Sequence, residues 1–232
     1  VGFRVNAFMP RYPFKMLSAP VSLTPAQKDN AMLLLLDPQR FASEPGVGLG
    51  LEANQRGIIH ELDDYYRQVG PALSNMARLL AACRRHDIAV VYSILNSRRP
   101  DRSDLSRQLR MTGLPVPIGD PGLDICGDVA PAPGDTVLPR GGYSPFVGTD
   151  LLAQLRHSRV DTVIVAGLMA NITVALTARE AADRDLGVVV VWDASASETL
   201  DEHRHMKTSL VGGLIFMRST QDIIDMLTDT AP

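Results

Sequence analysis

Three residues that could take part in chemistry stand at the ends of separate apolar segments: Asp37, Arg140 and Thr173. Asp37 directly follows the run Leu33 to Leu36, and the other two follow later apolar runs. A carboxyl group can act as a general acid or base, and a guanidinium can hold a carboxylate through two parallel hydrogen bonds. A threonine hydroxyl can pack or hydrogen-bond to a substrate. These residue types predict a hydrolytic or anion-binding site, provided that the fold brings them together.

Strands and helices are expected to alternate along most of the chain. The continuous apolar run over residues 30–37 is bounded by polar residues, which is typical of a strand buried on both faces. Further strands are expected at 88–95, 136–139, 160–166, 188–193 and 214–218, and helices at about 62–86, 150–157, 171–185, 202–210 and 221–227. This alternation predicts an α/β fold with a parallel sheet that is covered by helices on both faces.

Three segments do not follow the alternation. Residues 1–29 contain four prolines, which predicts an extended N-terminal arm in front of a single domain over residues 30–232. Residues 43–60 are rich in glycine and then polar, so a loop or a mobile cap is expected there. Residues 96–134 are long, irregular and rich in Arg and Pro. Loops of such length within a compact domain are usually functional.

The ends of four predicted strands carry the candidate residues. In a parallel sheet, ligands bind in the crevice outside the carboxyl ends of the strands. Asp37, the loop after Leu95, Arg140 and the segment from Gly167 to Thr173 all fall at such ends. The simpler interpretation of Asp37 is that it caps the following turn. Its place directly after six apolar residues instead favours a partly desolvated carboxyl group of the kind that a general acid needs.

Composition excludes several classes of function. A chain of 232 residues that is 45% hydrophobic can form one well-buried domain, and its net charge of −3 gives no basic footprint for nucleic acid. The longest apolar runs have strand length, so no membrane span is expected. Cys83 and Cys126 are the only cysteines, and no signal-type segment is recognised, so we expect a cytoplasmic protein without disulfides. The five histidines form no metal-ligand pattern, and Gly46 to Gly50 does not fit a dinucleotide fingerprint, so neither metal nor cofactor is expected.

Together, the segments Asp37–Phe41, Arg140–Phe146 and Gly167–Ala181 resemble the active-site segments of the isochorismatase-like hydrolases, also called the cysteine hydrolase superfamily. The resemblance covers residues 30–228. It implies a six-stranded parallel sheet in a three-layer sandwich, and assembly into dimers or larger homo-oligomers. It also implies that Asp37, Arg140 and Thr173 occupy the catalytic positions, and that a small-molecule substrate is bound by residues around them: Gln39, Phe41, Leu95, Arg99, Arg102, Tyr143, Met169 and Asn171.

Two substitutions separate the chain from most of this family, whose members carry Asp, Lys and Cys at the catalytic positions. Thr173 stands at the Cys position, and a threonine hydroxyl is a poor nucleophile without a strong adjacent base. Arg140 stands at the Lys position, and a guanidinium stays protonated, so it cannot relay protons. A thiol-based amidase mechanism is therefore not expected.

The isochorismatase branch of the family also lacks the nucleophilic Cys. Its members cleave a vinyl ether after an Asp protonates the enolpyruvyl methylene carbon. By this resemblance Asp37 would be the acid and Arg140 a clamp for a substrate carboxylate. A second clamp could come from the arginines of the following loop, Arg98, Arg99, Arg102, Arg107 and Arg110, for which a solvated basic loop is an equally good interpretation. Leu95 stands where those enzymes often present Gln, which indicates a less polar or differently shaped substrate.

Three functions are consistent with these residues. The first is a hydrolase of a small carboxylated enol-ether substrate that works without a thiol. The second is a hydrolase or lyase of another bond, in specialised metabolism, with Asp37 as acid–base and Arg140 holding an anion. The third is a family member without catalysis that serves as a binding or assembly partner. The first is favoured because the vinyl-ether mechanism depends on the aspartate that this chain retains.

Overall fold

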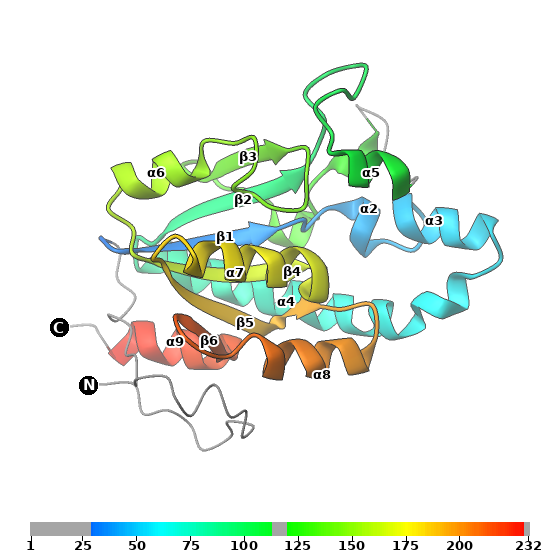
Figure 1. Cartoon of the computed structure of the whole chain (residues 1–232). Coiled ribbons are helices and arrows are strands. Elements are labelled where there is room, and N and C mark those ends of the chain that lie inside the picture. Colours follow the sequence, from blue (N-terminus) through cyan, green and yellow to red (C-terminus); the bar gives the residue numbers. More distant parts are fainter. Residues whose placement is uncertain (1–28, 113–119, 230–232) are drawn as a thin grey trace.

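A computed structural model describes residues 29–112 and 120–229 (Figure 1). Six strands form one parallel sheet in the order β3-β2-β1-β4-β5-β6. They are β1 (Ala31–Leu36), β2 (Ala89–Leu95), β3 (Thr136–Arg140), β4 (Thr162–Leu168), β5 (Gly187–Ala196) and β6 (Ile215–Arg218). The strand order reverses between β1 and β4, which makes the carboxyl ends of these two strands the place where a ligand crevice is expected.

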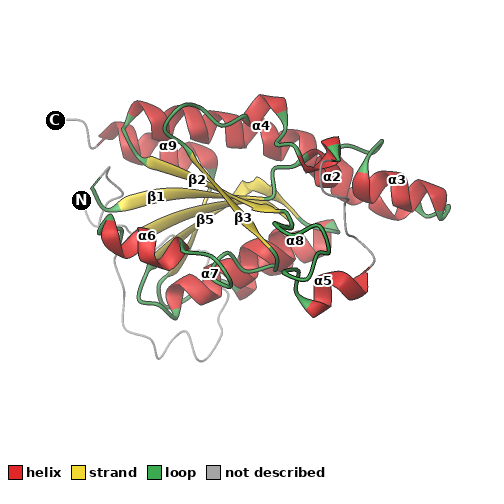
Figure 2. Cartoon of the chain, turned by 90° about the horizontal axis from the view of Figure 1, so that it is seen from above, coloured by secondary structure: helices red, strands yellow, loops and turns green. Residues whose placement is uncertain are grey.

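Helices cover both faces of the sheet, as Figure 2 shows. One face packs against α4 (Asp63–Arg85) and α9 (Thr220–Asp229). The other face packs against α6 (Leu151–His157), α7 (Ala175–Ala182) and α8 (Leu200–Ser209). The predicted three-layer sandwich with a six-stranded parallel sheet is therefore confirmed.

Strand β1 lies in the middle of the sheet and is buried along its whole length. Ala31, Leu33 and Leu35 point into the core beneath α4, and the alternate residues Met32, Leu34 and Leu36 point into the core on the opposite face. Burying one such leucine contributes on the order of 1.5–3 kcal/mol. The continuous apolar run thus fixes β1 at the centre, and the residue that follows it emerges at the switch point.

The prediction of a loop over residues 43–60 is wrong. The segment between β1 and α4 forms three short helices, α2 (Arg40–Ser43), α3 (Gly48–Gln55) and the 3-10 turn η1 (Ile59–Leu62). Glycine is a poor helix former, but here it is required by packing. A Cβ on Gly48, whose φ is +51°, would lie 2.4 Å from the Cβ of Phe41, and one on Gly50 would lie 2.4 Å from the carbonyl oxygen of Pro45. The glycines allow close contact between helices rather than mobility.

The long segment between β2 and β3 is not wholly irregular. Its described residues include α5 (Arg107–Thr112) and two 3-10 turns, η2 (Pro121–Leu123) and η3 (Gly127–Val129). The N-terminal arm predicted over residues 1–29 lies, apart from Asp29, outside the described residues. Within the part of the chain that the structure describes, no helix is long and apolar enough to cross a membrane.

Candidate active site

Asp37 lies at the switch point of the sheet. It follows β1 directly, and its backbone N–H donates to the carbonyl of Ser93 on β2 at 3.1 Å. This bond extends the hydrogen-bonded pairing of β1 with β2 by one residue. Its φ is +50°, in the left-handed region that few residues other than glycine adopt. Residues held in this conformation concentrate at functional sites, where the surrounding structure holds the strain in place.

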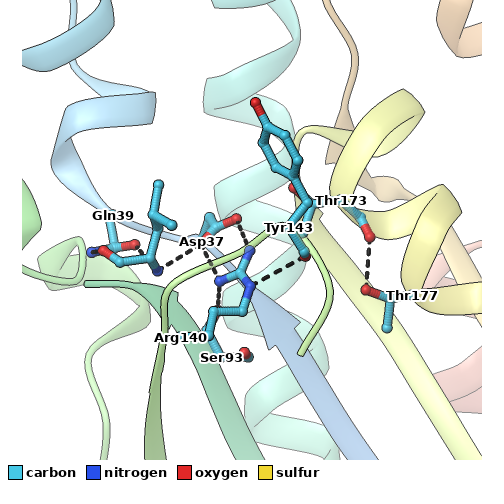
Figure 3. Close-up of polar contacts among 8 residues, drawn as sticks. Asp37, Gln39, Ser93, Arg140, Tyr143, Thr173 and Thr177 are labelled. Carbon is cyan, nitrogen blue, oxygen red and sulfur yellow. Dashed lines mark hydrogen bonds and ion pairs between the residues drawn. The ribbon is translucent and has the colours of Figure 1, made fainter. Parts of the chain in front are cut away.

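The Asp37 carboxylate is paired with Arg140, the last residue of β3, as Figure 3 shows. Nη1 of Arg140 donates to Oδ1 of Asp37 at 2.7 Å, and Nη2 donates to Oδ2 at 2.5 Å. Nη1 also donates to the carbonyl of Ser93 at 3.1 Å, and Nε donates to the carbonyl of Tyr143 at 3.2 Å. Arg140 is fully buried, and four of its five N–H groups are committed to protein acceptors.

This pairing corrects the predicted role of Arg140 as a free clamp for a substrate carboxylate. The guanidinium already holds a carboxylate, that of Asp37, through the two parallel hydrogen bonds that a substrate would have needed. Asp37 itself is 6% exposed, so its carboxyl group is buried, and Arg140 is its ionic partner there. Arg140 is better described as the group that orients Asp37 and balances its charge.

Gln39 and Leu95 form a wall beside Asp37. The side chain of Gln39 donates to the carbonyls of Leu95 and Leu123 at 3.2 and 2.7 Å, and accepts from the N–H of Leu95 at 2.9 Å. The same N–H donates to Oδ1 of Asp37 at 2.9 Å. Because both N–H groups of the Gln39 amide donate inside the protein and the side chain is fully buried, Gln39 braces the site and does not face a substrate.

The end of β4 is drawn close to β1 by Gly167. A Cβ at this position would lie 2.1 Å from the carbonyl oxygen of Leu36, so only glycine allows the approach. The helix predicted at 171–185 begins as a π-helical turn, η4 (Ala170–Val174), and continues as α7. Thr173 is buried, and its carbonyl accepts from the hydroxyl of Thr177 at 2.7 Å. Asn171 is half-buried, and its Oδ1 is a buried acceptor without a partner among the described residues.

Tyr143 closes another side of the site and extends above Asp37 in Figure 3. Partial burial raises the pKa of its phenol, and the nearby carboxylates of Asp37 and Glu198 add to the effect. Tyr143 therefore stays protonated at neutral pH and can donate a hydrogen bond. The position of its backbone is fixed by the hydrogen bond that its carbonyl accepts from Arg140.

The arginine-rich loop after β2 is packed against the end of β3. A Cβ on Gly141 would lie 2.2 Å from the carbonyl oxygen of Asp104, and the N–H of Ser106 donates to the carbonyl of Gly141 at 2.6 Å. Arg99 is exposed and donates to the hydroxyl of Ser103 at 3.1 Å. Arg102 is half-buried, and no carboxylate among the described residues pairs with its guanidinium.

The remaining predicted contacts lie in or against the core. Phe41 is buried in the core on the α4 side of the sheet, and Met169 packs against that core while remaining partly exposed. The structure thus brings Asp37, Arg140, Tyr143 and Leu95 together, and it uses Gln39 and Phe41 to support them.

Sequence reasoning missed Ser93 and Tyr65. The carbonyl of Ser93 accepts from both Arg140 and the backbone of Asp37. Tyr65, in the first turn of α4, is close enough to Asp37 for that carboxylate to contribute to its raised pKa, although burial and Tyr66 contribute more. A tyrosine on the apolar face of a helix gives no signal that separates it from ordinary core. Among the described residues, no group of three or more His, Cys, Asp or Glu side chains could hold a metal ion.

Comparison with known proteins assigns the family. The profile described as the isochorismatase domain matches residues 54–222, and the chain belongs to that family. The matched range begins after Asp37, so the assignment is independent of that residue. Among solved structures, a cysteine hydrolase from Pseudomonas syringae pv. phaseolicola 1448A superposes with a TM-score of 0.77 at 22% identity, covering 92% of this chain and all of that one. An isochorismatase family protein from Desulfovibrio vulgaris superposes with a TM-score of 0.70 at 26% identity, and the match covers 86% of this chain and 98% of that one.

Two curated relatives carry more specific names. The chain is 29% identical over 179 residues to the protein named isochorismatase from Bacillus subtilis (strain 168), which covers 73% of this chain and 57% of that protein. It is 29% identical over 156 residues to enterobactin synthase component B of Escherichia coli (strain K12). That alignment covers 63% of this chain and 54% of the relative. The alignments thus span little more than half the length of these relatives.

Proposed function

We propose that the protein is a hydrolase that cleaves a small carboxylated enol ether, of the isochorismate kind, without a thiol nucleophile. One observation carries the proposal: Asp37, the acid that this reaction requires, is held at the switch point of the sheet by its pair with Arg140. By the resemblance of the segment Gly167–Ala181 to the family, Thr173 would stand where the amidases carry their cysteine. Similarity to a relative named isochorismatase supports the same reaction class.

Proton transfer is assigned to Oδ2 of Asp37. Oδ1 accepts two hydrogen bonds, from Arg140 and from the N–H of Leu95, so both of its lone-pair positions are used. Oδ2 accepts one, from Arg140, and keeps one position for a proton. Asp37 takes up a proton on Oδ2 from solvent before the first turnover. This proton passes to the terminal methylene carbon of the enol ether, and the adjacent carbon becomes an oxocarbenium ion. Water adds to that carbon and returns a proton to Oδ2, and the hemiketal then breaks its C–O bond to release the alcohol and pyruvate.

Arg140 has a positioning role in this scheme. It fixes both carboxylate oxygens, so Oδ2 points in one direction when a substrate arrives. The substrate carboxylate then needs another cation. Arg102 is assigned to it, because it is half-buried on the loop that packs on the end of β3. Assembly into a homo-oligomer and a cytoplasmic location stay predictions.

The test is pyruvate release from isochorismate, measured with a lactate dehydrogenase couple. We expect turnover by the wild type, and a loss on the order of 10²–10⁴-fold in Asp37→Asn, the range that a general acid contributes. Asp124→Asn changes an exposed carboxyl and should leave the rate unchanged. A fully active Asp37→Asn variant would refute the mechanism. Ammonia release from simple amides in place of pyruvate would move the protein to the amidases, and no turnover of either substrate would support the binding or assembly role.

A further inference from the structure

The loop that carries Tyr143 is joined to α7 by a buried hydrogen bond. Residues 141–149 follow β3 without forming a helix or a strand, so their position depends on individual contacts. The hydroxyl of Ser144 donates to the carboxylate of Glu180 on α7, which lies 36 positions further along the chain. The same hydroxyl oxygen accepts from the N–H of Phe146 at 3.1 Å, and Ser144 is only 4% exposed. One side chain of the loop thus bonds both to its own backbone and to a helix of the outer layer.

Arg184, one turn after Glu180, supports this bond. Its guanidinium lies over the ring of Phe146, 4.8 Å from the centroid. Its Nη1 donates to the backbone carbonyl of Glu180 at 2.8 Å and lies 4.0 Å from the carboxylate of the same residue. Two side chains from successive turns of one helical segment therefore hold two residues of the loop.

The loop in turn restrains the group that holds Asp37. The carbonyl of Tyr143, the residue before Ser144, accepts from Nε of Arg140 at 3.2 Å, as Figure 3 shows. The two Nη atoms of Arg140 hold the carboxylate of Asp37. Because a guanidinium is planar and rigid, an acceptor at Nε restrains the direction of both Nη atoms. The contacts form a continuous path from Glu180 on α7 to Asp37.

We propose that Glu180 and Ser144 are positioning residues for the reaction at Asp37. Their hydrogen bond holds the loop so that Arg140 presents the Asp37 carboxylate in one orientation, and neither residue needs to touch the substrate. This inference rests on the proposed function for the reaction that Asp37 performs, and it adds a contribution from the helical layer to those from the strand ends.

The first experiment removes the bond from either side. We expect Ser144→Ala and Glu180→Ala each to lower kcat for pyruvate release from isochorismate by about ten- to a hundredfold, the range that follows from misplacing a reacting group by about 1 Å. The double variant should lose no more than either single variant, because all three lack the same bond. Glu180→Gln breaks the ion pair with Arg184 but keeps an acceptor for the Ser144 hydroxyl, so its kcat should stay within about threefold of wild type.

Thr149 provides a matched control at the other end of the same loop. Its hydroxyl donates to the carbonyl of Pro145 and accepts from the N–H of Leu151 at 3.2 Å. Thr149→Val therefore removes a loop hydroxyl of similar kind that is not bonded to α7. This variant should keep the wild-type kcat, whereas a general loosening of the loop would lower kcat in Thr149→Val as well.

A second measurement follows Arg140 directly and needs no turnover. The Nε–H signal of Arg140 is identified in nitrogen-15 NMR spectra by its loss in Arg140→Lys, and its rate of exchange with solvent is then measured. We expect exchange to be about tenfold faster or more in Ser144→Ala and in Glu180→Ala, the factor that corresponds to one hydrogen bond. Exchange should be unchanged in Thr149→Val and in Glu180→Gln.

Each other outcome is decisive. Unchanged Nε–H exchange in the two Ala variants, or equal effects in Thr149→Val, would overturn the inference, while pyruvate release by the wild type would leave the proposed function intact. A wild type that does not hydrolyse isochorismate, but whose Nε–H exchange responds to Ser144→Ala and Glu180→Ala alone, would overturn the function and keep the path from α7 to Arg140. An Ala variant that fails to fold would show that the bond serves the fold, and would also overturn the inference.

Discussion

Arg140 and Asp37 lie 103 positions apart in the chain and form a buried, two-armed ion pair, with N–O distances of 2.7 and 2.5 Å. The pair joins the ends of β3 and β1, which are separated in the sheet by β2. The carbonyl of Ser93 on β2 accepts from Arg140 as well. One guanidinium therefore ties together the carboxyl ends of three adjacent strands, and its substitution should affect the fold as much as the chemistry.

The first prediction concerns the stability of Arg140→Ala. Removing one partner of a buried pair leaves an uncompensated charge, so the free energy of unfolding should fall by about 3–5 kcal/mol in urea denaturation. Arg140→Lys should recover part of this loss, because an ammonium cannot make both parallel hydrogen bonds. Arg56→Ala, which breaks an exposed pair with Glu52, should cost less than about 1 kcal/mol. If Arg140→Ala kept full stability and lost only substrate affinity, Arg140 would be a substrate clamp after all.

The second prediction concerns Arg102. If its guanidinium holds the substrate carboxylate, Arg102→Ala should raise KM for isochorismate by about tenfold or more, since a hydrogen bond to a charged group contributes about 1.5–3 kcal/mol. The effect should shrink as salt is added, because the site is partly open to solvent. Arg107→Ala, an exposed arginine of the same segment, is the control. Similar changes in KM for both variants would indicate a diffuse basic surface instead of a specific contact.

The third prediction concerns the native thiols. Burial raises the pKa of Cys83 to about 12, and burial also raises the pKa of Cys126, so neither forms much thiolate at neutral pH. Iodoacetamide at pH 7.5 should therefore leave pyruvate release unchanged over an hour, with little alkylation seen by mass spectrometry. Time-dependent inactivation that substrate prevents would contradict this result and point to a thiol in the site.

The fourth prediction concerns Thr173→Cys. If Arg140 fills the lysine position of the family, as the resemblance implies, a thiol introduced here would lack an amine that can exchange protons, because a guanidinium stays protonated. The single variant should react slowly with iodoacetamide. The double variant Thr173→Cys with Arg140→Lys should react at least about tenfold faster, measured by mass spectrometry against the unreactive wild type. Equal rates in the two variants would mean that residue 140 does not control reactivity at this position.

The fifth prediction concerns the dependence of stability on pH. His203 on α8 faces Ser197 and Trp192, and burial, followed by the charge of Lys207, lowers its pKa. The unfolded chain then binds a proton more readily than the fold does. Stability from this group is present above the unfolded value near 6.5 and is lost as pH falls below it. The melting temperature should fall less between pH 7.5 and 5.5 in His203→Gln than in wild type, whereas exposed His205→Gln should behave as wild type.

The sequence by itself determined the layered fold and the edge of the sheet at which the site lies. Runs such as Leu33–Leu36 are apolar on both faces, and only a strand between two helical layers buries both. Because all the strands are parallel, residues that follow them must gather at one edge, so Asp37 and Arg140 could be assigned to a common site from their positions alone.

Only the tertiary structure decided how those residues are used. Whether Arg140 faces a ligand or Asp37 depends on the spacing of β3 and β1 across β2, which no local pattern encodes. The helix α3 was missed for a similar reason. Glycine is typical of loops, but α3 requires glycine at position 48 because Phe41 leaves no room for a Cβ there. Hydrophobic periodicity records which face of an element is buried, whereas hydrogen-bond partners are set by distances between segments far apart in the chain.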